Sequence, residues 1–265
     1  MVPTFCLRAA AVLSIVLVLL VFAGAGGLQP GAWAAEGFAP IEEILRELDA
    51  LSTFEDSDFS AVLTVITEEP EKGVEQTVVR QFRRDREDQF AMIIQEPRVQ
   101  RGQGYLMDGE NLWFYDPSSR QFSHTSLNEA FQDSDARNSD FGGWSYAEDY
   151  EITEYSEGKL GANDVYIVSL AALHDAVTYP FVKLWVTREN ALLLKVEEYS
   201  LTERLMRTAL FPSYARVGDS VIPRQMVFVD ELAVGQRTQI TFSEMSVQAI
   251  PDYVFTRAYL EQVNR

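Results

Sequence analysis

Period-two alternation of apolar and polar residues runs through most of the chain between residues 59 and 247, and it constrains the fold more than any other feature. Such a pattern gives a strand one buried and one exposed face. Twelve segments show it, at 59–66, 74–84, 89–95, 104–108, 111–115, 150–157, 165–170, 182–187, 192–201, 204–211, 221–232 and 236–247. Turn residues such as Asp108-Gly109 separate them. About a dozen strands with short turns and no βαβ rhythm predict an antiparallel meander that curves on itself.

Two segments depart from this pattern and give the fold class an α component. Apolar residues recur at a period near 3.6 from Ile41 to Leu51, after Pro40, which predicts one amphipathic helix of about three turns beginning at Pro40. The stretch from Leu127 to Tyr146 is polar with scattered aromatic residues. We interpret it as a mobile loop with short helical turns, so the fold class is mainly β with helices (α+β).

The first 34 residues have the composition of a secretory signal peptide. Arg8 is their only charged residue, residues 9–23 are apolar except for one serine, and Ala32-Trp33-Ala34 supplies small residues before a cleavage site. Cleavage after Ala34 predicts a periplasmic protein with a single domain, residues 35–265. The alternative is an uncleaved membrane anchor, because the apolar run approaches the length that spans a membrane.

Charge and cysteine content exclude several classes of protein. The 265 residues carry 22 Lys and Arg against 40 Asp and Glu, a net charge of −18. This charge argues against a nucleic-acid-binding protein and against a protein attracted to anionic membranes. Removing residues 1–34 leaves 231 residues with a charge of −19 and removes Cys6, the only cysteine. The exported chain must therefore fold without a disulfide, and the 47% hydrophobic content of the full 265-residue chain supports a sizeable core.

The sequence contains no recognisable catalytic or metal-binding motif. Its two histidines, His124 and His174, do not lie in a two-histidine spacing, and nucleophile-elbow, P-loop and G-x-G-x-x-G motifs are absent. Asp133-x-Asp135 resembles the start of a calcium loop, but Arg137 occupies the next ligand position. The abundant carboxylates neither locate nor exclude a glycosidase-like acid/base pair. We expect no enzyme, no cofactor and no metal site.

Large apolar side chains are concentrated on the predicted strands. Phe90, Met92 and Ile94 form one strand face, and a second group falls within eighteen residues: Tyr105, Leu106, Trp113, Phe114, Tyr115 and Phe122. One interpretation is an ordinary core beneath the helix. The other is that a curved sheet of this size has more concave apolar surface than a three-turn helix covers, which leaves a cavity for an apolar ligand.

Four groups of motifs, in order along the chain, resemble the LolA-like periplasmic lipoprotein carriers, and most closely the outer-membrane lipoprotein-sorting protein branch. They are residues 102–117 (GQGYLMDGENLWFYDP); Ser139-Asp140-Phe141 with residues 146–150 (YAEDY); residues 184–190 (LWVTREN) with 194–197 (LKVE); and Ile222-Pro223 with residues 241–245 (TFSEM) and 250–256 (IPDYVFT). The resemblance spans essentially the whole mature chain.

The resemblance implies an incomplete, strongly curved antiparallel β-barrel, or half-barrel, with a helical lid over an apolar cavity that shields acyl chains. Using strand alternation, we expect cavity or lid positions at Phe59, Leu63, Phe82, Phe90, Met92, Ile94, Trp113, Tyr115 and Trp144. In the best-known carrier an arginine holds the lid. Arg80, Arg83 and Arg84 are the candidates here, and strand parity does not choose between them.

The resemblance further implies a periplasmic carrier that shields the acyl chains of a lipoprotein or lipid for transfer towards the outer membrane. Its expected partners are that acylated lipoprotein or lipid and an inner-membrane exporter or transporter complex, and we expect a monomer without a nucleic-acid partner. The alternative is an envelope-stress sensor of the same fold that binds an anti-sigma-type partner. The sequence leaves open the identity of the cargo, its donor and its acceptor.

Overall fold

The computed structural model describes residues 30–218 and 220–263. The chain divides into two compact units, Met1–Gly37 and Phe38–Arg265, and the sheet and the site lie in the second. Most of the predicted signal peptide falls in residues 1–29, outside the described residues, so its cleavage stays a prediction. None of the described helices is both long and apolar enough to cross a membrane.

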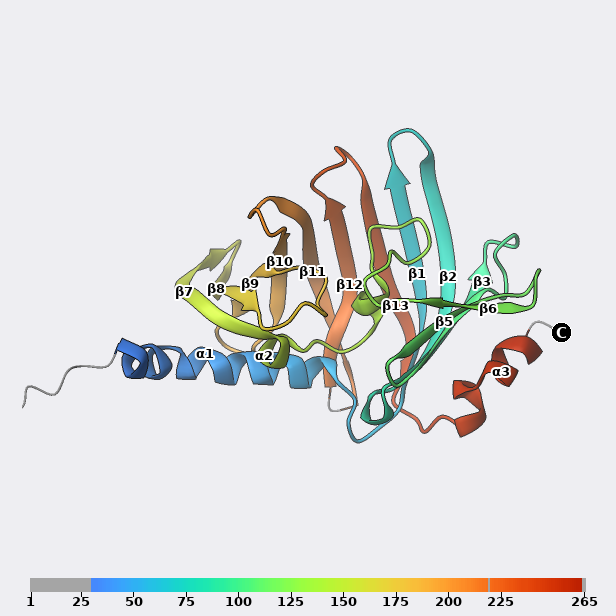
Figure 1. Ribbon diagram of the computed structural model, residues 1–265, viewed down its shortest axis with the longest axis horizontal. Helices are drawn as coiled ribbons and strands as arrows, with labels where there is room; N and C mark the ends of the chain where they lie inside the picture. The colour runs from blue at the N-terminus through green and yellow to red at the C-terminus, as the bar shows by residue number, and fades with distance from the viewer. Residues whose placement is uncertain (1–29, 219, 264–265) are drawn as a thin grey trace, which may run out of the picture. The chain divides into compact units, whose positions relative to one another are not determined.

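The described residues form one antiparallel sheet of thirteen strands (Figure 1). The strands are β1 (Phe59–Glu69), β2 (Gly73–Arg84), β3 (Gln89–Glu96), β4 (Gly104–Asp108), β5 (Asn111–Asp116), β6 (Gln121–Thr125), β7 (Tyr150–Leu160), β8 (Asn163–Ala172), β9 (Phe181–Thr187), β10 (Leu193–Tyr199), β11 (Leu205–Val217), β12 (Ser220–Asp230) and β13 (Arg237–Ser246). The helices are α1 (Pro30–Ser52), α2 (Tyr146–Asp149) and α3 (Arg257–Gln262), with 3-10 turns η1 (Asp85–Glu87), η2 (Asn138–Phe141) and η3 (Asp252–Phe255).

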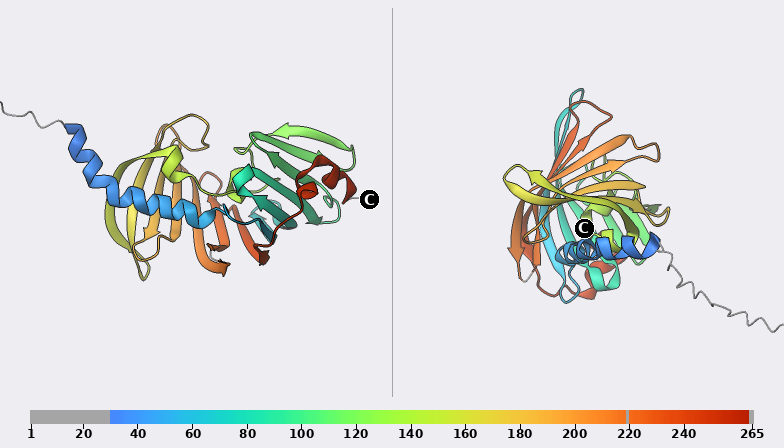
Figure 2. Two further views of the ribbon diagram at one scale, coloured as in Figure 1. Left: turned by 90° about the horizontal axis from the view of Figure 1, so that it is seen from below. Right: turned by 90° about the vertical axis from the view of Figure 1, so that its left-hand side faces the viewer.

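The sheet consists of two meanders joined through its first and last strands. Its order is β6-β5-β4-β3-β2-β1-β13-β12-β11-β10-β9-β8-β7, so β1 pairs with β13, and β6 and β7 are the two free edges. The sheet is curved but not closed, as the sequence predicts (Figure 2). Because β6 and β7 lie at opposite edges, the segment that connects them must cross the open side. We call this segment, residues 126–149, the crossing segment.

Both faces of the sheet carry a hydrophobic core. The concave face packs against α1 through Ile41, Leu45 and Leu48, and against the crossing segment through Phe131 and Phe141. A smaller cluster on the opposite face joins β3, β4 and β5 to η3 and α3; it contains Ala91, Ile93, Leu106, Tyr115, Ile250, Val254, Phe255 and Leu260. In Figure 2, α3 lies beside the end of the sheet formed by β3 to β6.

Three elements differ from the sequence prediction. Strand β6 was not predicted, because its sequence QFSHT has only one strongly apolar residue and it forms an exposed edge. Helix α1 begins at Pro30, so Pro40 lies inside the helix rather than in its first turn. Helix α3 was not predicted either, since its six residues are too few to show a helical period.

Candidate functional site

A cavity of about 800 Å³ lies between the concave face of the sheet, the C-terminal part of α1 and the crossing segment. Side chains from six strands give it an apolar floor: Phe90, Met107, Val182, Val196, Ala209, Phe211, Met226 and Phe228. Trp144 of the crossing segment covers the floor and meets the ring of Phe211 edge to face, 5.4 Å between centroids. Across the described ranges, no group of three or more His, Cys, Asp or Glu residues could hold a metal ion.

The end of α1 fixes one side of the crossing segment by hydrogen bonds to its backbone. The hydroxyl of Ser52 accepts from the Trp144 amide at 2.8 Å, and Oδ2 of Asp49 accepts from the Ala147 amide at 2.7 Å. From the sheet, the buried Gln81 amide donates to the Phe141 carbonyl at 2.7 Å. Each bond satisfies a backbone group that the irregular segment cannot pair internally.

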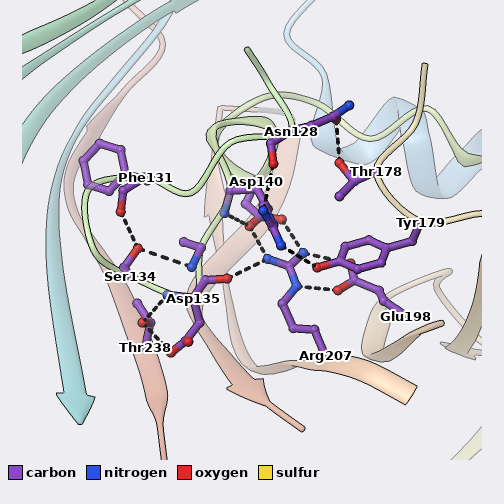
Figure 3. A network of polar contacts seen from close by, with 12 residues as sticks. Asn128, Phe131, Ser134, Asp135, Asp140, Thr178, Tyr179, Glu198, Arg207 and Thr238 are labelled. Atoms are coloured by element: carbon purple, nitrogen blue, oxygen red, sulfur yellow. Dashed lines mark hydrogen bonds and ion pairs between the residues drawn. The ribbon is translucent and has the colours of Figure 1, made fainter. Parts of the chain in front are cut away.

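Arg207 on β11 fixes the other side of the crossing segment (Figure 3). Its guanidinium makes a bidentate pair with Asp140, at 2.7 and 3.0 Å, and donates to the Asp135 carbonyl at 2.9 Å. It also makes two hydrogen bonds to Glu198 on the neighbouring strand β10. All five N–H donors of this buried side chain are therefore used, three of them on the crossing segment.

The surroundings of Arg207 are built to hold a buried charge. Its guanidinium lies over the rings of Phe228 and Tyr179, at 4.6 and 5.4 Å from the centroids. Burial acts to lower the pKa of Arg207, but Asp140 and Glu198 outweigh it and hold that pKa well above its ordinary value. Burial raises the pKa of Glu198, and Arg207 opposes this. Because Arg207 pairs with both carboxylates, its removal leaves Glu198 and Asp140 without this cation inside the protein.

Asp135 makes a third connection, between the crossing segment and β13. Its backbone amide donates to the Thr238 hydroxyl at 2.9 Å, and that hydroxyl donates to Asp135 Oδ2 at 2.9 Å. The side-chain amide of Gln236 donates to Oδ1 at 2.7 Å. The crossing segment is therefore held by α1, by both meanders and by the strand that joins them.

The raised pKa of Asp49 makes the stability of the protein depend on pH. Burial, with smaller contributions from Asp149 and Glu148, raises its pKa to about 6 from an ordinary 3.8, against backbone hydrogen bonds from Ala147 and Tyr146. Its Oδ1 is buried and has no hydrogen-bond partner among the described residues. A raised folded pKa means that this group's contribution to stability is present at low pH and is lost as the pH rises through about 6.

We therefore expect Asp49→Asn, which keeps the acceptor for the Ala147 amide, to stabilise the protein at neutral pH. The free energy of unfolding of the variant should exceed that of the wild type by up to about 2–3 kcal/mol near pH 7.5, and the difference should shrink towards about pH 4. Urea unfolding across this pH range measures it. A difference that does not change with pH would contradict the assignment.

Six of the nine sequence-predicted site residues lie on the concave face. Phe90 and Trp144 line the cavity directly. Phe59, Leu63, Met92 and Ile94 belong to the same concave cluster but are fully packed within it.

Phe82, Trp113 and Tyr115 lie on the opposite face, so the structure does not bring them together with the other six. Phe82 and Tyr115 pack in the cluster with α3, and the ring of Trp113 lies under Arg257 of α3 at 3.9 Å. The physical reason is strand parity: Leu112 and Phe114, one residue away from these positions on β5, face the concave core.

The three arginines proposed for the lid also divide between the faces. Arg83 is on the concave face, where it donates to the Ser52 carbonyl at 3.1 Å and pairs with Asp85 at 2.6 Å. Arg80 and Arg84 point to the opposite face, where Arg84 pairs with Asp58 and Asp252. None of the three donates a hydrogen bond to the crossing segment among the described contacts; Arg207 does.

Sequence reasoning missed Arg207 and Glu198, although the strands carry a signal for both. Arg207 points to the same face of β11 as Ala209 and Phe211, and Glu198 points to the same face of β10 as Val196. Each is therefore a charged residue at a position where the alternation of its strand calls for an apolar one. Such a position predicts a buried, paired charge.

Solved structures with the same fold support this description. A LolA superfamily protein from Nitrosomonas europaea is 26% identical, with a TM-score of 0.71, over 82% of this chain and 98% of that one. A protein from Vibrio parahaemolyticus, described as an outer membrane lipoprotein-sorting protein domain, is 19% identical (TM-score 0.73, 83% and 97%). A DUF1329 family protein from Desulfovibrio piger is 18% identical (TM-score 0.74, 83% and 97%).

Comparison with curated protein sequences gives no match. Residues 86–262, about two thirds of the chain, match the model of a family described as "-like: Uncharacterized protein". The resemblance that the sequence motifs predict is confirmed by the structural neighbours. The chain therefore belongs to this family of uncharacterized proteins, and its fold is that of the LolA superfamily and the outer membrane lipoprotein-sorting proteins.

Proposed function

We propose that this protein is a carrier that binds the acyl chains of a lipoprotein or another lipid in the cavity beneath the crossing segment and passes them towards the outer membrane. The observation that carries the proposal is the cavity with its apolar floor; charged residues such as Asp49, Glu198 and Arg207 lie elsewhere in its lining. Its volume of about 800 Å³ lies within the ordinary range for ligand sites, and its floor is aliphatic and aromatic. Burial is worth about 0.8 kcal/mol per CH₂, so a chain of roughly 14–16 carbons could be held without a charged contact.

The crossing segment supplies the cover that such a carrier needs. It connects the two free edges of the sheet, and polar contacts together with the buried side chains of Phe131 and Phe141, rather than continuous strand pairing, hold it in place. Those contacts can open without breaking the sheet. In this proposal Phe90 and Trp144 contact the acyl chain, together with Val196, Phe211 and Phe228, which sequence reasoning did not select.

The proposal includes a cellular setting that follows from the sequence. Cleavage after Ala34 would release the carrier into the periplasm. An inner-membrane exporter or transporter complex would hand over the cargo, and the acceptor would lie at the outer membrane. The name of the Vibrio neighbour, an outer membrane lipoprotein-sorting protein domain, supports the outer membrane as the destination.

A variant that narrows the cavity tests the proposal. We expect the purified protein to retain copurified lipid and to take up a fluorescent fatty acid that unlabelled lipid displaces. Val196→Phe adds volume at the cavity floor. It should weaken uptake by roughly tenfold or more, because the acyl chain loses contacts with the floor that it does not regain elsewhere. The measurement is a fluorescence titration with matched protein concentrations.

Leu210→Phe is the matched control, because Leu210 lies between the cavity-lining residues Ala209 and Phe211 on β11 and therefore points to the opposite face. Its uptake should equal that of the wild type. Absence of both bound lipid and uptake in the wild type would contradict the carrier function, and equal losses in the two variants would contradict the location of the site.

A further inference from the structure

Exposed aliphatic side chains gather at one end of the sheet, away from the cavity. Ten large hydrophobic side chains are exposed in the described part of the chain, and five of them lie at the tips of four hairpins. They are Val74 (69% exposed), Val99 (87%), Leu201 (80%), Leu232 (44%) and Val234 (95%). We call these five residues the tip surface.

The four hairpins are neighbours in the sheet. The turns β3–β4, β1–β2, β12–β13 and β10–β11 follow one another in the strand order, and antiparallel pairing places all four turns at the same end of their strands. A Cβ on Gly235 would lie 3.1 Å from the Pro70 side chain, which puts two of the tips in direct contact. In Figure 1 the β1–β2, β12–β13 and β10–β11 tips follow one another along the upper edge of the sheet, from the top of the view down to its left.

The opposite ends of these strands lack this feature. The turns there are residues 85–88, 109–110, 188–192 and 218–219. Leaving aside residue 219, which the structure does not describe, none of these turns carries an exposed large hydrophobic side chain. Exposed aliphatic side chains therefore occur in the turns at one end of these strands and not in the described turns at the other end.

The charge of the four turns also differs from that of the chain. The loops 70–72, 97–103, 200–204 and 231–236 contain four basic residues, Lys72, Arg98, Arg101 and Arg204, and three acidic ones. Their net charge is +1 in a chain of −18. Glu68 pairs with Val74 across the β1–β2 hairpin and Glu75 follows Val74 on β2, so both acidic residues lie on the strands beside that tip residue. The loops themselves lack the excess of negative charge that the whole chain carries, which lowers their repulsion from a lipid surface.

We propose that the tip surface inserts shallowly into a lipid bilayer with predominantly zwitterionic headgroups. All five residues are aliphatic, and burial of such side chains at the boundary between headgroups and acyl chains is favourable. Their distribution favours lipid, because single side chains on separate tips can each enter a fluid surface, while a protein partner needs a continuous complementary patch. Glu68 and Glu75 limit the depth of insertion.

This inference does not depend on what the cavity binds, and the two can be tested separately. Vesicles of phosphatidylcholine and phosphatidylethanolamine are mixed with the purified protein, and bound protein is measured by flotation. Wild-type protein should bind to the vesicles. The vesicle-bound fraction of the double variant Val74→Asp/Val234→Asp should be lower by roughly tenfold or more. Replacing part of the phosphatidylcholine by phosphatidylglycerol should weaken binding, because of the −18 charge.

Ala162→Asp/Val263→Asp is the matched control, since it adds the same charge at exposed positions outside the tip surface. It should bind vesicles as the wild type does, and both variants should keep the wild-type uptake of fluorescent fatty acid and the wild-type melting temperature. Failure of the wild type to bind vesicles, or equal losses in the two variants, overturns the inference. Failure of fatty acid uptake with intact vesicle binding overturns the proposed carrier function instead.

Discussion

Replacing Arg207 by methionine is expected to lower the free energy of unfolding by about 3–5 kcal/mol, the typical result of removing one partner from a buried ion pair. The substitution leaves Glu198 and Asp140 close together in the core without their shared cation. It also removes the three hydrogen bonds that the crossing segment receives from β11. The measurement is urea unfolding at neutral pH, with hydrogen exchange of residues 126–149 as a local readout.

The control removes the two carboxylate charges together with the arginine. In Arg207→Met/Glu198→Gln/Asp140→Asn the buried charges are gone, so most of the lost stability should return, while protection of the crossing segment should stay low. Arg207→Lys keeps the charge but not the five-donor fork, and we expect an intermediate loss. If Arg207→Met unfolds at the wild-type urea concentration, this network does not stabilise the protein.

A disulfide between residues 53 and 143 is expected to abolish acyl uptake reversibly. A Cβ on Gly143 would lie 2.9 Å from Oγ1 of Thr53, so cysteines at the two positions would have their sulfur atoms within bonding reach. Gly143 does not have a positive φ, so a side chain there brings no backbone strain. The bond would tie the crossing segment to the residue that follows α1.

In Thr53→Cys/Gly143→Cys, with Cys6 replaced by serine, oxidation should slow the uptake of a fluorescent fatty acid at least about a hundredfold, because the open state is no longer populated. Reduction with dithiothreitol should restore uptake. The two single-cysteine variants control for the substitutions themselves and should not respond to oxidation. Uptake that is unchanged in the oxidised double variant would show that the crossing segment does not open when cargo enters.

Sequence reasoning predicted the fold well because alternation is a local signal. All twelve predicted strands are present, and the irregular stretch after Leu127 is the crossing segment with its short helical turns. The errors fall where local signals are weak. Strand β6 is short and polar, and α3 is shorter than the window over which a helical period can be recognised.

The site was harder to predict because it depends on which face each strand presents. The sequence analysis assigned the faces of β5 one residue out of step. Trp113 and Tyr115 therefore lie on the opposite face, next to Arg257 and the second core cluster. Arg207 meets Asp140, 67 residues earlier in the chain, and no spacing rule connects two such residues. Parity within one strand could have identified Arg207 as a buried charge, but only the three-dimensional structure shows its partner.

The pairing of the first strand with the last has a consequence for how the chain folds. Each meander is built from local hairpins, but Val62 of β1 pairs with Ser243 of β13, 181 residues later. The edge of β1 therefore stays unpaired until nearly the whole polypeptide is available. Loop-closure entropy makes such a contact slow to form, and the exposed edge is prone to aggregation in the meantime. We expect the two meanders to form first and their junction to be the rate-limiting step of folding.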